Sequence, residues 1–112
     1  IDRGEPQRGD VVVFKSPDDG TRLIKRVVAV GGDRVALIDG RLWIDGKPLH
    51  DTEASDIEHF GDRDVRLDLR YGGGPDIFDT TVPQGMALVL GDHRGNSRDG
   101  RYFGLVPMAS LY

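Results

Sequence analysis

A lysine and a serine stand in two segments of this sequence whose residue types suit chemistry. Lys25 lies inside the apolar run 23–30, and Ser97 lies among charged and turn-forming residues in the run 91–101. A lysine amine can accept a proton only in its neutral form, and apolar surroundings favour that form. A serine hydroxyl can hold such an amine because it both donates and accepts hydrogen bonds. The two segments together predict a lysine base that is held by a serine.

The neighbours of Lys25 follow from the alternation of side chains along a strand. Lys25 shares its face with Leu23 and Val27, whereas Arg26 points to the other face. Gly91 opens the serine-containing run, and a residue without a Cβ lets the backbone approach the lysine closely. On the strand alone, the competing interpretation is a lysine at a sheet edge that extends into solvent.

Three motifs connect these segments to a known family. Residues 8–14 are Arg-Gly-Asp-Val-Val-Val-Phe, the lysine segment 24–33 ends in Gly-Asp, and the serine segment 91–104 begins with Gly-Asp. With these motifs in this order, the chain resembles the bacterial type I signal peptidases, serine proteases that use a Ser/Lys dyad. The resemblance spans most of the chain. It implies that Lys25 is the general base and that Ser97 orients Lys25.

The nucleophilic serine of that family lies upstream of the first motif, just after a membrane anchor. No serine precedes Arg8 in this chain, whose serines are Ser16, Ser55, Ser97 and Ser110. We therefore expect an excised part of the extracytoplasmic domain of a signal peptidase I. The nucleophilic serine and the anchor would lie outside this piece, which by itself is expected to be inactive.

The resemblance also assigns supporting residues. It implies an ion pair between Asp99 and Arg101 that fixes the serine loop, and we expect Arg26 to join this pair. Gly91 and Asp92 complete the supporting set. The residues expected to line shallow apolar pockets for the substrate are Val13, Leu23 and Ile24. The sequence departs from the common family pattern at His93, Gly95 and Gly100.

The implied substrates are exported preproteins, whose signal peptides carry small residues in an Ala-x-Ala pattern before the cut. An extended peptide of this kind can add to an exposed strand edge, where main-chain hydrogen bonds supply affinity. The implied location is the cell membrane, with the catalytic domain on the extracytoplasmic face.

Other functions fit parts of the sequence. A non-catalytic, signal-peptidase-like peptide-binding or assembly protein would keep the groove, although the presence of both Lys25 and Ser97 favours the enzyme. A self-cleaving repressor with a similar Ser/Lys core lacks the 91–104 motif in this form. The acidic residues of that motif lack the regular spacing of a calcium loop. The Arg-Gly-Asp tripeptide at 8–10 leads into a strand and cannot form a flexible adhesion tip.

Composition limits the remaining possibilities. At 112 residues, the chain 1–112 is expected to form a single catalytic-core domain. Fifteen basic and nineteen acidic residues give a net charge of -4, which argues against nucleic-acid binding. There is no cysteine, and the histidines at 50, 59 and 93 are not at metal-ligand spacing. We expect no metal and no cofactor, and we place the histidines at the solvated surface.

Sixteen glycines and six prolines between short apolar runs predict a mainly β fold. We expect hairpins and short antiparallel strands, similar to the fold of the signal peptidases. Strands 11–14 and 23–30 would form one hairpin, with the first strand buried on both faces. Asp39-Gly40 predicts a two-residue type I′ turn. Residues 50–80 are expected to form a small, polar and variable β insertion that leaves the core, with an amphipathic strand at 65–71.

Overall fold

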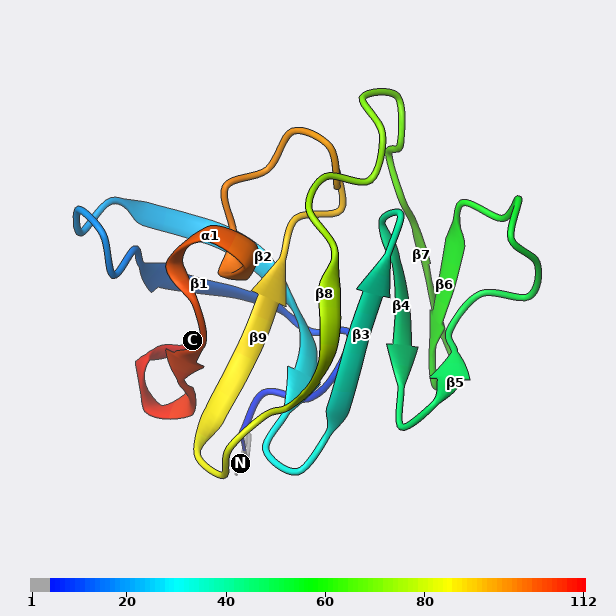
Figure 1. The fold of residues 1–112 in the computed structure, drawn as a ribbon. Coiled ribbons are helices and arrows are strands. Elements are labelled where there is room, and N and C mark those ends of the chain that lie inside the picture. Colours follow the sequence, from blue (N-terminus) through cyan, green and yellow to red (C-terminus); the bar gives the residue numbers. More distant parts are fainter. Residues whose placement is uncertain (1–4) are drawn as a thin grey trace.

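A computed structural model describes residues 5–112, which form the expected mainly β fold (Figure 1). The strands are β1 (Val11–Lys15), β2 (Arg22–Val30), β3 (Arg34–Ile38), β4 (Arg41–Ile44), β5 (Lys47–Pro48), β6 (Ile57–Phe60), β7 (Arg63–Arg66), β8 (Ile77–Thr81), β9 (Met86–Leu90) and β10 (Val106–Pro107). The helices are α1 (Gly100–Phe103) and the 3-10 helix η1 (Met108–Ser110). No helix within residues 5–112 has both the length and the apolar character needed to cross a membrane.

The first sheet carries the lysine segment. Its strand order is β1-β2-β9-β10, and all neighbours are antiparallel. β1 and β2 form the predicted hairpin, in which Val12 lies opposite Lys25. The prediction that β1 is buried on both faces is wrong. Val12 and Phe14 are buried whereas Val11 is 54% exposed, because this edge strand packs on the core with one face only.

A second four-stranded sheet has the order β5-β4-β3-β8. Asp39 and Gly40, which connect β3 to β4, have φ angles of 50° and 81°. A type I′ turn requires positive φ at both central residues, so the predicted turn is confirmed. The third sheet is the β6–β7 hairpin.

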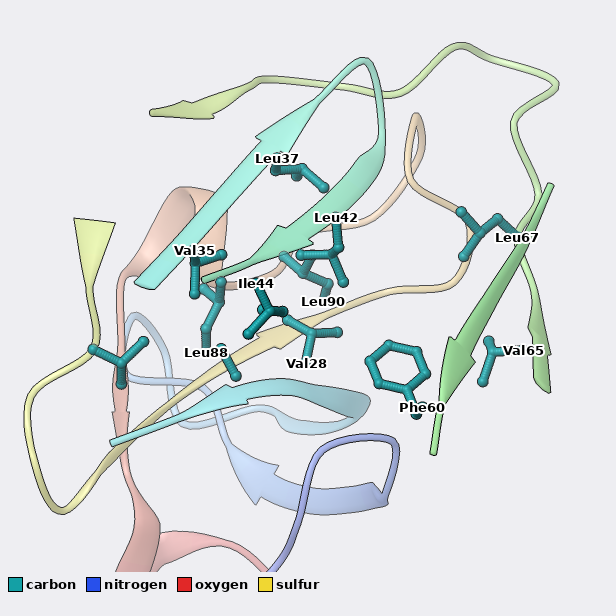
Figure 2. Close-up of a cluster of buried hydrophobic side chains, with 12 residues drawn as sticks. Val28, Val35, Leu37, Leu42, Ile44, Phe60, Val65, Leu67, Leu88 and Leu90 are labelled. Carbon is teal, nitrogen blue, oxygen red and sulfur yellow. The ribbon is translucent and has the colours of Figure 1, made fainter. Parts of the chain in front are cut away.

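The main hydrophobic cluster joins the three sheets. Figure 2 shows its side chains between the β3–β4 hairpin and strands β2 and β9, with Phe60 and Val65 contributed by the β6–β7 hairpin. Its buried members are Val28, Ala29, Val35, Leu37, Leu42, Ile44, Phe60, Val65, Leu67, Val82, Leu88 and Leu90. The expectation that residues 50–80 leave the core is therefore wrong, since Phe60, Val65 and Leu67 are buried in the main cluster.

The predicted strand at 65–71 ends earlier than expected, because β7 stops at Arg66. The chain then runs beside the serine loop, residues 91–101. Asp68 N donates to Asp92 O at 2.9 Å, and Arg94 N donates to Asp68 O at 3.2 Å. In Figure 1 the connection from β7 to β8 and the connection from β9 to α1 both lie at the upper end of the molecule. The alternating residues 65–71 thus begin at the end of β7 and continue as a segment that hydrogen-bonds to the serine loop.

A β-bulge in β2 lets one strand serve two clusters. The register between β2 and β9 shifts between Val27 and Ala29. Val28 and Ala29 therefore enter the main cluster, whereas Val27 and Val30 face a second cluster. The second cluster consists of Val12, Phe14, Val27, Ala87, Val89, Val106, Met108 and Leu111.

Candidate active site

Lys25 and Ser97 meet although they are far apart in the sequence. Lys25 Nζ donates a hydrogen bond to Ser97 Oγ at 2.9 Å. β2 carries the lysine and the loop after β9 carries the serine, and the two come together because β9 pairs with β2. The structure therefore brings together the two side chains from which the chemistry was predicted.

The surroundings of Lys25 are apolar on the side of the sheet that it faces. Val12 lies directly opposite it in β1, and Leu23 and Val27 share its face of β2. Val12 and Val27 are buried in the second cluster, and Leu23 packs against that cluster. Lys25 itself is half-buried. Its stem lies along apolar side chains, and the amine lies at the border of the cluster, where it binds Ser97.

Gly91 allows the close approach of the serine loop to Lys25. A Cβ at Gly91 would overlap Ser97 Oγ, and it would lie 2.5 Å from Ser97 Cβ and 3.7 Å from Lys25 Nζ. Real Cβ atoms do not approach other heavy atoms as closely as 2.5 Å, so a side chain at this position displaces Ser97. The glycine predicted to lie beside the lysine is found there.

Asp99 and Arg101 form a buried ion pair at the end of the serine loop. Arg101 Nη2 lies 2.9 Å from Asp99 Oδ2, and the two side chains are 1% and 0% exposed. Asp99 also accepts a hydrogen bond from Gly91 N at 2.9 Å and caps helix α1 by accepting from Arg101 N. Both residues lie at the start of helix α1. The cap explains the spacing, because an N-cap side chain binds the backbone two residues later.

Arg26 does not join this pair, contrary to expectation. Its guanidinium binds Asp92 with two hydrogen bonds, at 3.0 and 2.9 Å, and donates to Gly9 O at 2.6 Å. The alternation of β2 explains the difference, because Arg26 lies on the face opposite Lys25. Arg26 and Asp92 thus connect the start of the serine loop to the turn before β1, and among residues 5–112 Asp99 pairs with Arg101 instead.

The three residues expected in the substrate pockets do not share one face. Leu23 lies on the Lys25 side of the sheet, whereas Val13 and Ile24 lie opposite each other on the other side. Ile24 is 66% exposed. A single pocket beside Lys25 can therefore contain the side chain of Leu23 but not those of Val13 and Ile24.

The two edges of the β1–β2 hairpin differ in what they can bind. At the outer edge of β1, Val13 N donates to Tyr112 O at 2.7 Å, and Tyr112 N donates to Val13 O at 3.1 Å. The other edge belongs to β2, where β9 pairs only from Arg26 onward. Val27 N donates to Asp10 O, so the backbone groups of Val27 point to the β1 side of β2. Because backbone groups alternate in direction along a strand, the N–H and C=O of Ile24 point to the β9 side. Among residues 5–112 no strand pairs with that edge at Ile24.

Two residues beside the site were missed by sequence reasoning. Arg94 of the serine loop and Glu58 of β6 form an ion pair at 2.8 Å, and both side chains are 0% exposed. One signal was available for Glu58. It lies two residues before Phe60, so the alternation of a strand turns its carboxylate toward the core, where it requires a cation.

The histidines correct another expectation, because they are not all at the solvated surface. His50 is buried and packs edge-on against Trp43, with ring centroids 5.6 Å apart. His93 is half-buried and stacks on Tyr71. His59 is bound by two carboxylates, Asp64 at 2.6 Å and Asp51 at 3.1 Å, and these hydrogen bonds raise its pKa.

Fold and site together define a class of protein, a mainly β protein in which a serine hydroxyl holds a lysine amine. A family model described as "Signal peptidase, peptidase S26" matches residues 2–112. The chain therefore belongs to the S26 signal peptidase family, and the resemblance seen in the three motifs is confirmed.

Individual relatives agree with this assignment. The chain is 34% identical over 133 residues to signal peptidase I of Rickettsia canadensis (strain McKiel), covering 96% of this chain and 49% of the relative. It is 36% identical over 123 residues to signal peptidase I of Pseudomonas fluorescens, covering 92% of this chain and 42% of the relative. The chain thus spans about half the length of the curated relatives that it matches.

A solved structure is similar over nearly the whole chain. The crystal structure of a signal peptidase I from Enterococcus faecalis V583 superimposes with a TM-score of 0.66 at 35% sequence identity. The match covers 96% of this chain and 94% of that chain. The predicted signal-peptidase-like β fold is therefore confirmed.

Proposed function

We propose that this chain supplies the general base of a signal peptidase I, a serine endopeptidase that removes signal peptides from exported preproteins. The observation that carries the proposal is the 2.9 Å hydrogen bond from Lys25 Nζ to Ser97 Oγ in a chain of the S26 family. Lys25 is the base and Ser97 orients it. Asp99, Arg101 and Gly91 hold the serine loop in place.

The nucleophilic serine comes from a segment outside this chain. Ser97 already holds the lysine. The other three serine hydroxyls bind the backbone of their own turns, Ser16 with Asp18 N, Ser55 with Ile57 N and Ser110 with Pro107 O. Since none of these hydroxyls is directed at Lys25, the chain alone is expected to be inactive.

The proposed chemistry follows from what a neutral amine can do. By donating one N–H to Ser97, the amine of Lys25 keeps its lone pair for the proton of the nucleophilic serine. The serine oxygen then bonds to the scissile carbonyl carbon while Lys25 takes the proton. When the C–N bond breaks, Lys25 passes this proton to the leaving amine, and water later releases the acyl group by the same route.

The proposed substrate is the extended end of a signal peptide with an Ala-x-Ala-like sequence. The edge of β2 at Ile24 supports this, because a peptide that pairs there passes directly beside Lys25. Leu23, on the face of Lys25, is the side chain best placed to contact a small residue of the substrate. The proposed location is the cell membrane through an anchor outside this chain, with this domain on the extracytoplasmic face.

The competing function is a non-catalytic protein that binds the same peptides. Half-buried Lys25 and its bond to Ser97 favour the enzyme, because an amine at the border of an apolar cluster is costly to keep without a use.

The test is cleavage of a preprotein-like peptide with an Ala-x-Ala site by the longer protein that carries the upstream segment. Mass spectrometry would locate the cut. We expect one cut directly after the second alanine and loss of cleavage in Lys25→Ala. An absence of cleavage by the longer protein, together with unchanged peptide binding by Lys25→Ala, would contradict the enzyme and support the non-catalytic peptide-binding protein.

A further inference from the structure

The buried pair of Arg94 and Glu58 lies directly behind the candidate active site and has no part in the chemistry described above. Both side chains are 0% exposed, and Arg94 Nη2 lies 2.8 Å from Glu58 Oε1. Arg94 belongs to the serine loop, whereas Glu58 belongs to β6, 36 residues earlier in the chain. The pair therefore connects the serine loop to the β6–β7 hairpin through the interior of the protein.

The Arg94 guanidinium binds three different parts of the fold. Nε donates to Gly91 O at 2.9 Å, and Nη1 donates to Gly40 O, in the β3–β4 turn, at 2.7 Å. The second oxygen of Glu58 accepts from Leu42 N at 2.7 Å. Both buried charges are thus paired and hydrogen-bonded, which is the condition under which a buried ion pair is tolerated.

The bond to Gly91 links this pair to the active site. Asp99 binds the N–H of Gly91 and Arg94 binds its C=O, so the peptide groups on both sides of this residue are held. Gly91 is the residue against which Ser97 Oγ packs, and a Cβ there would lie 3.7 Å from Lys25 Nζ. A shift of Gly91 therefore changes the place of Ser97 relative to Lys25.

Stability alone does not account for this arrangement. A buried ion pair is weak evidence for stability, because apolar residues of similar volume are often as stable. What an apolar pair cannot do is direct three hydrogen bonds from one planar group to three segments.

From these contacts we propose that Arg94 and Glu58 are positioning residues for the proposed reaction. They hold Gly91, and through it Ser97, at the distance from Lys25 that proton transfer needs. Glu58 makes this contribution from the buried face of β6. This inference rests on the proposed peptidase activity of Lys25 and Ser97.

The first test compares Arg94→Lys with Arg66→Lys in the longer, active protein. Lysine keeps the charge opposite Glu58 but cannot bind three separate acceptors. Arg66 pairs with Asp56 at the surface of the β6–β7 hairpin, which also carries Glu58, so Arg66→Lys is a matched control. Since a small misplacement of catalytic groups is costly, we expect Arg94→Lys to lower kcat roughly tenfold to a hundredfold. KM should stay within about twofold, because substrate binding at β2 is untouched, and Arg66→Lys should behave as the unchanged protein.

The second test uses amide hydrogen exchange in the 112-residue chain and does not depend on activity. Arg94→Lys should speed exchange at Gly91 N and Asn96 N, in the serine loop, and leave Val27 N, in the β1–β2 hairpin, protected. Unchanged kcat, or equal loss of protection at Gly91 and Val27, would overturn the positioning role. If Arg94→Lys does not fold, Glu58→Gln, which keeps the shape of the side chain, takes its place with the same expected results.

The two tests separate the two proposals. If the longer protein does not cleave, the proposed function fails, and exchange alone decides whether Arg94 positions the serine loop. If it cleaves and Arg94→Lys cleaves equally well, only the positioning role fails.

Discussion

The side chain of Ser97 fills the space beside Gly91 that a Cβ on Gly91 would need. This relationship ties a backbone position with no chemistry of its own to the hydroxyl that holds Lys25. It makes the serine loop sensitive to a change of a single methyl group, and it gives a prediction that separates steric from chemical effects.

Gly91→Ala should abolish cleavage by the longer protein and destabilise the fold by about 1–3 kcal/mol, as overpacking at buried positions does. The double substitution Gly91→Ala with Ser97→Gly removes the overlapping side chain. It should recover most of the lost unfolding free energy but none of the activity. Denaturant unfolding and peptide cleavage measure the two effects. A double variant that does not recover the lost unfolding free energy would show that the overlap is not the cause of the destabilisation.

Ser97→Ala should act mainly on catalysis. It removes the acceptor that orients the Lys25 amine, so we expect kcat to fall roughly tenfold to a hundredfold. The free energy of unfolding should fall by no more than about 1.5 kcal/mol, the usual value of one hydrogen bond. Steady-state kinetics and urea unfolding check the two values. A wild-type kcat in this variant would remove Ser97 from the account.

Two of the ion pairs of the serine loop, Asp99 with Arg101 and Asp92 with Arg26, should differ in importance. Asp99→Asn leaves Arg101 buried without its carboxylate, and we expect a loss of about 3–5 kcal/mol of unfolding free energy. Asp92→Asn breaks a pair in which Asp92 is 39% exposed, and the loss should be at most about 1 kcal/mol. Chemical denaturation of the two variants gives the comparison. Equal losses would contradict the difference in burial.

The bridge that His59 forms between Asp64 and Asp51 predicts a dependence of stability on pH. Asp64 and Asp51 raise the pKa of His59 above its ordinary value of 6.5. Because the pKa is higher in the folded state, the stabilisation is fully present below pH 6.5 and is lost as the pH rises through the raised value. Thermal unfolding temperatures measured from pH 5 to pH 9 should fall across this window, and His59→Gln should remove that part of the fall. A pH profile unchanged by His59→Gln would exclude the bridge as its cause.

The parts of this structure that sequence could predict are those set by local rules. The β1–β2 hairpin and the Asp39-Gly40 turn follow from short-range turn chemistry. The contact of Lys25 with Ser97 was expected from three motifs in order, because a family resemblance carries long-range information that a pattern in one segment does not.

The parts that sequence could not predict depend on partners far away in the chain. Arg94 is one of several arginines in a charged loop, and only the fold shows that Glu58 lies beside it in the interior. The partner of Arg26 was wrongly predicted for a related reason, since the pairing of β2 with β9 places Asp92, and not Asp99, on its face. In both cases an ionic side chain resembles a surface residue until its partner is located.

The most direct test of the central claim is the cleavage rate of the longer protein when Lys25 is replaced by alanine. Lys15, exposed on β1 of the same hairpin, provides the matched control as Lys15→Ala. If Lys25 is the general base, Lys25→Ala should lower kcat at least about a thousandfold, and Lys15→Ala should leave kcat unchanged. A Lys25→Ala protein that is folded and cleaves at the rate of the control would contradict the account.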